Sequence, residues 1–428
     1  MSRGNREYMN NTILSGKKLL LLGGAGDMVN VTKLAQSMGC KVYIADYYDT
    51  DRSPAKLIAD EYTNISIADY DEVVAYIKNN NIDGVLSGFT DSYLVHYLNV
   101  CEKANLSHYG SEKAFGIAVD KMLFKEACKK CGVPVIPGTN AYSFDDAKAF
   151  ADNNSYPLML KPADNSGSRG VIKCECEEDL KSCYEYALSY SPTDNVIIER
   201  FMDCDSVGIV YQFAGDKAKL VAMCDRDTYH AEKSGSGVIT GTRYPSIYLE
   251  RYIEEVDEAM KRLFKENGFR DGMVSPMAFV DEDGFYMCEM CYRPSGGRHY
   301  ALINDQNGVN GLELLIKLAV TGKLDGYDPE KETPYFEDYC GMIHIIGVPG
   351  KKVAKVSGIE EIESLPGVIE YIQDIPVNKT VGEDGTSAQV LSSVWLKGKN
   401  KEEYEAKIKE IKSLLKICDA DGMSIIKE

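Results

Sequence analysis

Long apolar runs, a hydrophobic leader and an excess of positive charge are all missing from this 428-residue sequence. No apolar run reaches the length of about 18 residues that a membrane-spanning helix requires, so no membrane span is predicted. Residues 1–15 are polar and lack the apolar core of a signal peptide. We therefore expect a cytoplasmic protein.

The charge balance is strongly acidic, with 66 Asp and Glu against 48 Lys and Arg and a net charge of −18. This balance argues against non-specific binding to nucleic acid or to anionic membranes, and we expect neither as a partner. Lys and Arg side chains can still converge in one cleft, so the charge is compatible with a local site for a small anionic ligand.

The 13 cysteines are scattered and odd in number, which in a cytosolic chain is typical of reduced thiols. Cys128 and Cys131, like Cys288 and Cys291, have the CxxC spacing, and this raises the alternative of a structural zinc site. The first pair lies in a helical pattern and the second in a strand pattern. Neither is flanked by the tight turns of a zinc knuckle, so the zinc site is disfavoured.

The N-terminal part of the chain has the outline of a mononucleotide-binding unit. A buried-strand pattern at 17–22 leads into a glycine turn at 23–27, then a helix, and then a strand that closes on Asp46. Binding of NAD with Asp46 on a ribose is an alternative, but the glycines read GGAGDM and lack the third glycine of GxGxxG. Further helix–strand units follow, and residues 1–118 are predicted to form a doubly wound parallel-sheet domain.

Residues 159–172 read as two short apolar strands joined by a polar, glycine-containing loop, with Lys161 at the end of the first strand. Such a loop can expose several backbone N–H groups on one side and so cover phosphates. An ordinary surface hairpin is the alternative. The loop residues of interest are Ser166, Gly167, Ser168, Arg169 and Gly170.

Glu289 is the unusual residue of a predicted β-hairpin over 273–291, because it stands in an otherwise apolar return strand. An ionised carboxylate in such a strand is costly unless a metal ion or a cation compensates it. A structural salt bridge would also explain it. From about residue 332 the pattern changes to short strands and helices, which predicts a compact α+β ending.

Five features follow one another in order along the chain: Lys121 in a helix, Lys161 before the glycine loop, the strand end at 199–202, Glu289, and Arg293. This order resembles the ATP-grasp superfamily of ligases over essentially the whole chain. It is most similar to the biotin carboxylase and carbamoyl-phosphate synthase large-subunit branch, which includes carboxylate–amine ligases. The resemblance implies an α/β and α+β multidomain chain. Its parts are a pre-ATP-grasp domain at 1–118, a small ATP-grasp subdomain at 119–197, a large one at 198–330, and a C-terminal α+β domain at 331–428.

The resemblance also implies roles for single residues. Lys121 would contact the α-phosphate of ATP, Lys161 would bridge the phosphate and adenine ends, and residues 166–170 would fold over the β- and γ-phosphates. Glu289 would hold a magnesium or manganese ion, Arg293 would lie beside the transferred phosphoryl group, and Arg298 would bind the substrate carboxylate or acyl phosphate. The residues implied for adenine and ribose are Glu199, Arg200, Phe201, Met202 and Asp205.

Two positions depart from the family pattern. Met277 stands where a second metal carboxylate is usual, and Cys291 stands where Asn or Asp is usual. Sulfur is a poor ligand for magnesium. The function implied is an ATP-dependent ligase that activates a carboxylate or bicarbonate as an acyl phosphate and transfers it to an amine or similar nucleophile, releasing ADP and phosphate. The alternative is an ATP-binding protein of the same fold with weakened or lost catalysis. The acid, the amine and the oligomeric state stay unidentified, and a homodimer is one candidate because dimers are the commonest soluble assembly.

Overall fold

The computed structural model describes residues 14–164, 169–230 and 237–427. Three predicted loop residues, Ser166, Gly167 and Ser168, lie outside this range. Within it, none of the helices is both long enough and apolar enough to cross a bilayer.

The N-terminal domain is a parallel four-stranded sheet in the order β3-β2-β1-β4, as the strand and helix patterns predicted. The side chains of residues 19–22 are fully buried, because helices cover the sheet. Leu22 lies beside Ser87 in the sheet, so the glycine turn and the loop after β4 meet at one edge. The strands are β1 (Lys18–Leu22), β2 (Lys41–Ala45), β3 (Glu61–Thr63) and β4 (Gly84–Ser87), and the helices are α1 (Gly26–Ser37), α2 (Tyr70–Asn80) and α3 (Tyr93–Ala104).

A second four-stranded sheet, in the order β5-β8-β6-β7, carries the predicted glycine loop. The prediction of two strands joined by this loop is confirmed, since β6 and β7 pair antiparallel from Leu158 opposite Cys174 to Leu160 opposite Ile172. The strands are β5 (Gly138–Ala141), β6 (Leu158–Pro162), β7 (Ile172–Cys174) and β8 (Val196–Arg200). The helices of this region are α4 (Glu112–Val119), α5 (Lys121–Lys130), α6 (Phe144–Ala151) and α7 (Leu180–Leu188).

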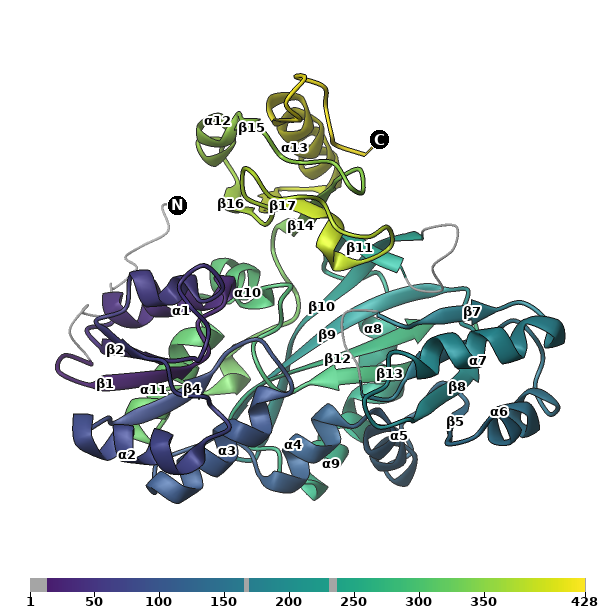
Figure 1. Cartoon of the computed structure of the whole chain (residues 1–428), viewed down its shortest axis with the longest axis horizontal. Coiled ribbons are helices and arrows are strands. Elements are labelled where there is room, and N and C mark those ends of the chain that lie inside the picture. Colours follow the sequence, from purple (N-terminus) through teal and green to yellow (C-terminus); the bar gives the residue numbers. More distant parts are fainter. Residues whose placement is uncertain (1–13, 165–168, 231–236, 428) are drawn as a thin grey trace.

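An eight-stranded sheet in the order β13-β12-β9-β10-β11-β14-β17-β16 runs through the middle of the molecule (Figure 1). It crosses the predicted boundary at residue 330, because β11 pairs with β14 from Gly241 opposite Ile343 to Tyr244 opposite Cys340. The C-terminal part therefore extends the preceding sheet, and the division of the chain into domains stays a prediction. The strands are β9 (Asp205–Ala214), β10 (Lys217–His230), β11 (Gly237–Tyr244), β12 (Gly272–Val280), β13 (Phe285–Cys291), β14 (Tyr339–Ile346), β16 (Val368–Gln373) and β17 (Val390–Gly398).

Helices pack against this sheet, and a small two-stranded sheet lies near the C-terminus. The predicted helix over 249–267 contains a π-helical stretch, Ile253–Asp257, between two α-helical segments. The helices are α8 (Leu249–Tyr252), α9 (Glu258–Glu266), α10 (His299–Asn307), α11 (Gly311–Thr321), α12 (Ile359–Glu363) and α13 (Lys401–Leu414), and the small strands are β15 (Lys355–Ser357) and β18 (Lys416–Cys418).

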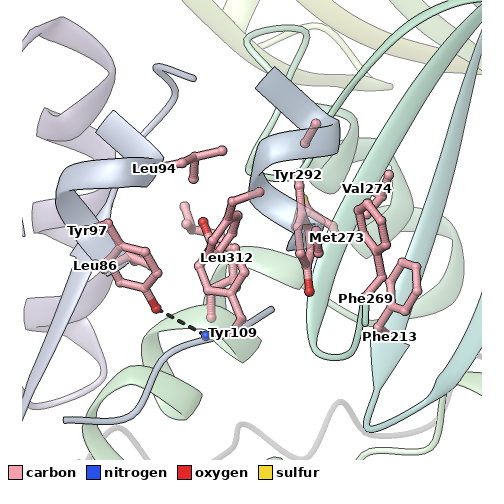
Figure 2. Close-up of a cluster of buried hydrophobic side chains, with 14 of the residues drawn as sticks. Leu86, Leu94, Tyr97, Tyr109, Phe213, Phe269, Met273, Val274, Tyr292 and Leu312 are labelled. Carbon is pink, nitrogen blue, oxygen red and sulfur yellow. Dashed lines mark hydrogen bonds between the residues drawn. The ribbon is translucent and has the colours of Figure 1, made fainter. Parts of the chain in front are cut away.

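A cluster of buried aromatic rings joins the N-terminal domain to the eight-stranded sheet (Figure 2). The ring of Tyr109 lies 5.1 Å from that of Tyr97 and 5.3 Å from that of Tyr292, and Phe269 lies 4.9 Å from Tyr292. Truncating such a ring to alanine typically costs about 3 to 5 kcal/mol. Because Arg293 follows Tyr292 directly, this cluster fixes the backbone from which Arg293 extends.

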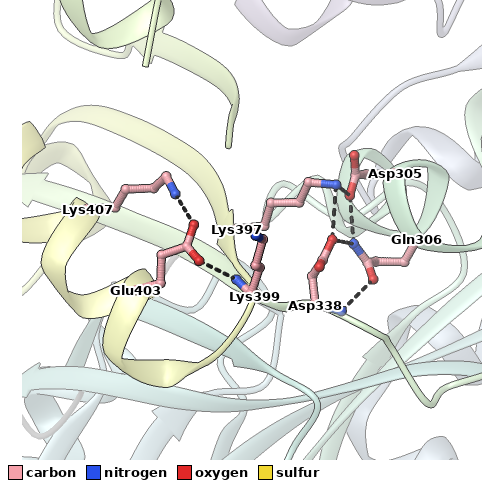
Figure 3. Close-up of polar contacts among 7 residues, drawn as sticks. All are labelled: Asp305, Gln306, Asp338, Lys397, Lys399, Glu403 and Lys407. Carbon is pink, nitrogen blue, oxygen red and sulfur yellow. Dashed lines mark hydrogen bonds and ion pairs between the residues drawn. The ribbon is translucent and has the colours of Figure 1, made fainter. Parts of the chain in front are cut away.

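A network of charges attaches the C-terminal strands to α10 (Figure 3). The Lys397 ammonium on β17 lies 2.7 Å from the Asp305 carboxylate on α10 and 3.1 Å from that of Asp338. Next to it, Glu403 accepts a hydrogen bond from the Lys399 backbone and pairs with Lys407 one helical turn on. The segment that follows Arg298 is thereby held from the C-terminal side.

Candidate functional site

Lys161, Glu199 and Lys125 form a buried ion triad between the second sheet and α5. In the antiparallel pair of β6 and β8, Met159 lies opposite Glu199, so Lys161 is a diagonal neighbour of Glu199 on the same face. The Lys161 ammonium lies 2.5 Å from one Glu199 oxygen, and the Lys125 ammonium lies 2.5 Å from the other. Lys125 also donates to the Ile136 carbonyl, at 3.1 Å.

Burial makes these charges depend on one another, since the three residues are only 1% to 7% exposed. Burial alone would raise the pKa of Glu199, but the two ammonium groups outweigh it and hold that pKa below its usual value. Burial would lower the pKa of Lys161, yet the negative charge of Glu199 raises it, with a smaller contribution from Glu289. The structure thus brings Lys161, Glu199 and Glu289 together as interacting charges.

Lys121 is the first residue of α5, and a capping residue fixes it there. The Asp120 side chain accepts hydrogen bonds from the backbone N–H of Met122 at 2.8 Å and of Leu123 at 3.0 Å. Residues four apart lie on one helix face, so Lys121 and Lys125 share the face that Lys125 turns toward Glu199.

The predicted hinge begins at the end of β8. The Arg200 backbone N–H donates to the Pro137 carbonyl, and the Phe201 N–H donates to the Pro157 carbonyl. The Met202 amide makes no hydrogen bond to another described residue, so its N–H can donate to a ligand. Asp205 begins β9 and is exposed, and its carboxylate accepts a hydrogen bond from the Tyr248 hydroxyl at 2.5 Å.

Of the predicted glycine loop, the structure describes Arg169 and Gly170. Arg169 is exposed. Gly170 has a φ of +77°, and a Cβ there would lie 2.5 Å from the Tyr190 Cβ, so only glycine fits this position without a shift. The loop therefore closes onto β7 through a position where no side chain is tolerated.

Glu289 and Met277 lie directly opposite each other on β13 and β12, as the resemblance to the family required. The Glu289 side chain is exposed, so the argument that a buried carboxylate needs compensation was wrong. Met287 and Cys288 just before it are both buried, and the register of β13 against β12 shifts at this point, so strict alternation along the strand does not predict the exposure of Glu289. Its carboxylate has no hydrogen bond or ion pair with another described residue.

The residues around Glu289 offer little for a divalent cation beyond this one carboxylate. Within the described part of the chain, no three His, Cys, Asp or Glu side chains gather in a way that could hold a metal ion. Met277 and Cys291 add sulfur atoms, which magnesium binds poorly. The fit is thus for one ion held by Glu289 together with oxygens from a bound phosphate.

Arg293 is paired with a carboxylate from the N-terminal domain. Its Nε donates to Asp91 at 2.8 Å, and a second guanidinium nitrogen donates to the other Asp91 oxygen, which makes the pair bidentate. Asp91 lies in the loop between β4 and α3, at the edge of the parallel sheet where ligands of open α/β folds bind.

Arg298 has a different set of partners. It is 4% exposed and lies 2.9 Å from the Asp27 carboxylate of α1 and 2.9 Å from that of Glu370 on β16. Its guanidinium also lies 5.7 Å from the Trp395 ring. A ligand anion would have to displace two carboxylates here, so this geometry favours a link between domains over the predicted substrate contact.

The glycine turn after β1 is closed by Asp46. The Asp46 carboxylate is 4% exposed and accepts the backbone N–H of Gly24 at 2.9 Å and of Tyr48 at 3.0 Å. Both oxygens are therefore used within the chain, which removes the ribose acceptor on which the NAD alternative depended.

The parallel N-terminal sheet, the second sheet with its glycine loop and the large antiparallel sheet together define an ATP-grasp fold. The chain belongs to the ATP-grasp superfamily, and residues 120–327 match the family model "Carbamoyl-phosphate synthase L chain, ATP binding domain". This match includes Lys121, Lys161, Glu199, Glu289 and Arg293.

Relatives and solved structures with the same fold are remote in sequence. The carbamoyl phosphate synthase large chain of Thermotoga petrophila is 24% identical over 330 residues, which are 73% of this chain and 28% of that protein. An L-amino acid ligase from Bacillus licheniformis has a TM-score of 0.78 at 15% identity, covering 95% of this chain and 99% of that one. The biotin carboxylase domain dimer of the Hydrogenobacter thermophilus 2-oxoglutarate carboxylase, with MgADP and bicarbonate, has a TM-score of 0.75 at 16% identity, covering 94% and 90%. The chain spans only 14% to 50% of the length of the first curated relatives it matches.

The sequence interpretation missed Lys125 and Asp91. Lys125 could have been found from its spacing, because it lies one turn after Lys121 on a helix with an otherwise apolar buried face. Asp91 could have been noticed as a carboxylate just after a parallel strand, but its partner lies 202 residues away in the sequence.

Proposed function

We propose that this protein is an ADP-forming ligase that activates a carboxylate or bicarbonate as an acyl phosphate and transfers the acyl group to an amine. The observation that carries this proposal is the Lys161–Glu199 ion pair. The pair is buried, its Glu199 lies three residues before a hinge amide that has no hydrogen bond to another described residue, and Glu289 acts on the Lys161 charge, within a part of the chain that matches an ATP-binding family. A small-molecule acid and a small-molecule amine would be the substrates. The cytoplasmic location and the homodimer stay predictions.

For the nucleotide, the proposal assigns the adenine end to the hinge. The Met202 N–H would donate to the adenine ring, Glu199 would accept from its amino group, and Asp205 would accept from the ribose hydroxyls. Lys121 and Lys161 would bind the phosphates. Residues 166–170 would cover the β- and γ-phosphates, and Arg200 and Phe201 would complete the adenine pocket through their backbone.

The chemistry has two steps. A carboxylate oxygen attacks the γ-phosphorus, the bond to the β-phosphate oxygen breaks, and ADP leaves. The amine nitrogen then attacks the carbonyl carbon of the acyl phosphate, loses a proton and expels phosphate. Positive charge from Lys161 and Arg293 stabilises the phosphoryl group as it transfers. Magnesium or manganese held by Glu289 would neutralise further phosphate charge.

An ATP-binding protein with weakened or lost catalysis is the second candidate. The specific observation in its favour is the register that sets Met277, and not a carboxylate, opposite Glu289. The two candidates share the nucleotide site and differ only in turnover.

The assay that tests the proposal is release of ADP and phosphate with ATP and magnesium or manganese, across pairs of amino acids, dicarboxylates, bicarbonate and amines. We expect turnover that depends on both an acid and an amine, and loss of that turnover in Lys161→Met. ATP binding without turnover for any pair would leave the second candidate standing. Absence of ATP binding would contradict both.

A further inference from the structure

We propose that Lys125 is a positioning residue for nucleotide binding, which acts by neutralising Glu199 so that the charge of Lys161 is left for the phosphates. The inference rests on the proposed function only in taking ATP as the ligand. It assigns Lys125 no contact with ATP.

The geometry divides Glu199 between two cations. Each carboxylate oxygen accepts from one lysine at 2.5 Å, so neither ammonium is shared between the two oxygens. Lys125 is anchored further by the Ile136 carbonyl, at 3.1 Å, and its side chain is 1% exposed. It therefore has no access to solvent, and its place on α5 is fixed by burial as well as by charge.

The charge count explains why a second lysine matters. Lys161 and Glu199 alone would form a pair with no net charge, which attracts a polyphosphate less than a cluster with one excess cation does. With Lys125 the triad carries a net charge of one positive unit, next to the hinge. A buried site screens charges weakly, so this unit acts on a nearby anion much more strongly than a surface lysine does.

A purely structural role for Lys125 makes a different prediction. If the lysine only held α5 against the sheet, its loss would weaken the binding of adenosine and of ATP alike. If it neutralises Glu199, its loss would weaken ATP much more than adenosine, which has no phosphates. Removing the Glu199 charge as well would then restore the preference for ATP.

The experiment compares the affinities for ATP and for adenosine in the full-length protein, by titration calorimetry without acid or amine. In Lys125→Met we expect the ratio of ATP to adenosine affinity to fall by about tenfold or more. In the double variant Lys125→Met/Glu199→Gln we expect this ratio to return to within about threefold of the original value. Lys129→Met, an exposed lysine on the same helix, is the matched control and should leave the ratio unchanged.

Two results would overturn the inference: an unchanged ratio in Lys125→Met, which includes an equal fall for both ligands, or no recovery in the double variant. If Lys125→Met does not fold, Lys125→Gln decides, because it can keep the hydrogen bond to the Ile136 carbonyl without the charge. It should lower the ratio as Lys125→Met would, and an unchanged ratio in this variant would overturn the inference. Failure of the proposed function looks different. ATP binding without turnover would contradict the ligase assignment and leave this inference intact. Absence of ATP binding would contradict both.

Discussion

At the residue scale, Met277 is the position on which the metal site depends. Met277 on β12 lies directly opposite Glu289 on the neighbouring strand β13, and a second carboxylate at this position would complete a site of hard oxygen ligands. We expect Met277→Glu to lower the magnesium concentration needed for half-maximal ADP formation by about tenfold, which corresponds to about 1.4 kcal/mol. The measurement is a magnesium titration of the ADP-release assay at saturating ATP.

Met277→Gln is the control for that prediction, because it has a similar shape and an amide oxygen but no charge. It should give a much smaller shift. Equal shifts in the two variants would show that polarity, and not a second carboxylate, limits metal binding. No shift in either variant would show that the metal does not bind at the Met277–Glu289 pair.

Glu332 gives a prediction about pH and stability. It is 3% exposed and accepts hydrogen bonds from Gln212, Tyr327 and Asn307. Burial raises the pKa of Glu332 to about 7, against hydrogen bonds that lower it. The folded state thus holds this proton more tightly than the unfolded state, and the stability gained from it is lost as pH rises from about 4.5 through 7.

Glu332→Gln removes that titration while keeping the shape of the side chain. We expect the free energy of unfolding of the variant, relative to that of the original protein, to rise by about 3 kcal/mol as the pH is raised from 5 to 8. Urea unfolding of both proteins at the two pH values measures this difference. A difference that does not change with pH would contradict the raised pKa.

Sequence alone could identify Lys121, Lys161, Glu199 and Glu289 as candidates, since their order along the chain resembles a known family. It could not give their surroundings. Glu289 looked costly in an apolar strand because the sequence does not show which face of a strand meets solvent. Glu199 was assigned to adenine only, because its two lysine partners come from a neighbouring strand and from a helix 74 residues earlier.

At the scale of elements, α5 is the helix that brings two lysines to the site, and Asp120 caps it. We expect Asp120→Ala to lower stability by about 1 kcal/mol, because two backbone N–H groups lose their acceptor. The same change should weaken ATP binding, because Lys121 lies in the first turn of α5, which would unwind without the cap. Chemical unfolding and nucleotide titration measure the two effects.

Asp120→Asn separates capping from charge in this prediction. Asn caps helices about as well as Asp, so both stability and ATP affinity should stay close to those of the original protein. If Asn behaves like Ala, the negative charge beside Lys121 matters more than the cap does.

Most helices and strands could be predicted from the sequence, because apolar and polar residues recur along them with the period of a helix or a strand. The parallel strands 18–22 and 41–45 stand out as apolar runs, and the β12–β13 hairpin stands out by its turn. The sheet order could not be predicted in the same way. The pairing of β11 with β14 joins segments about a hundred residues apart, and nothing local marks either as the other's neighbour.

At the scale of the whole molecule, the candidate site is assembled from domains that meet through charged side chains. Arg293 and Asp91 join the antiparallel sheet to the N-terminal domain, and Arg298 joins α1 to β16 through Asp27 and Glu370. These pairings depend on how the domains dock. Their residues can be singled out in a sequence as charged, but their partners cannot.

Substitution of Arg298 can distinguish two roles for this residue, a link between domains and a contact with the substrate. Its buried guanidinium compensates two carboxylates, and removing one partner of a buried charge cluster costs about 3 kcal/mol. We therefore expect Arg298→Met to lower the free energy of unfolding by about that amount and to speed hydrogen exchange in both α1 and β16. Arg298→Met/Glu370→Gln should recover part of the loss, because one uncompensated carboxylate is gone. If Arg298 instead binds substrate, Arg298→Met will leave stability and exchange unchanged and raise the KM for the acid.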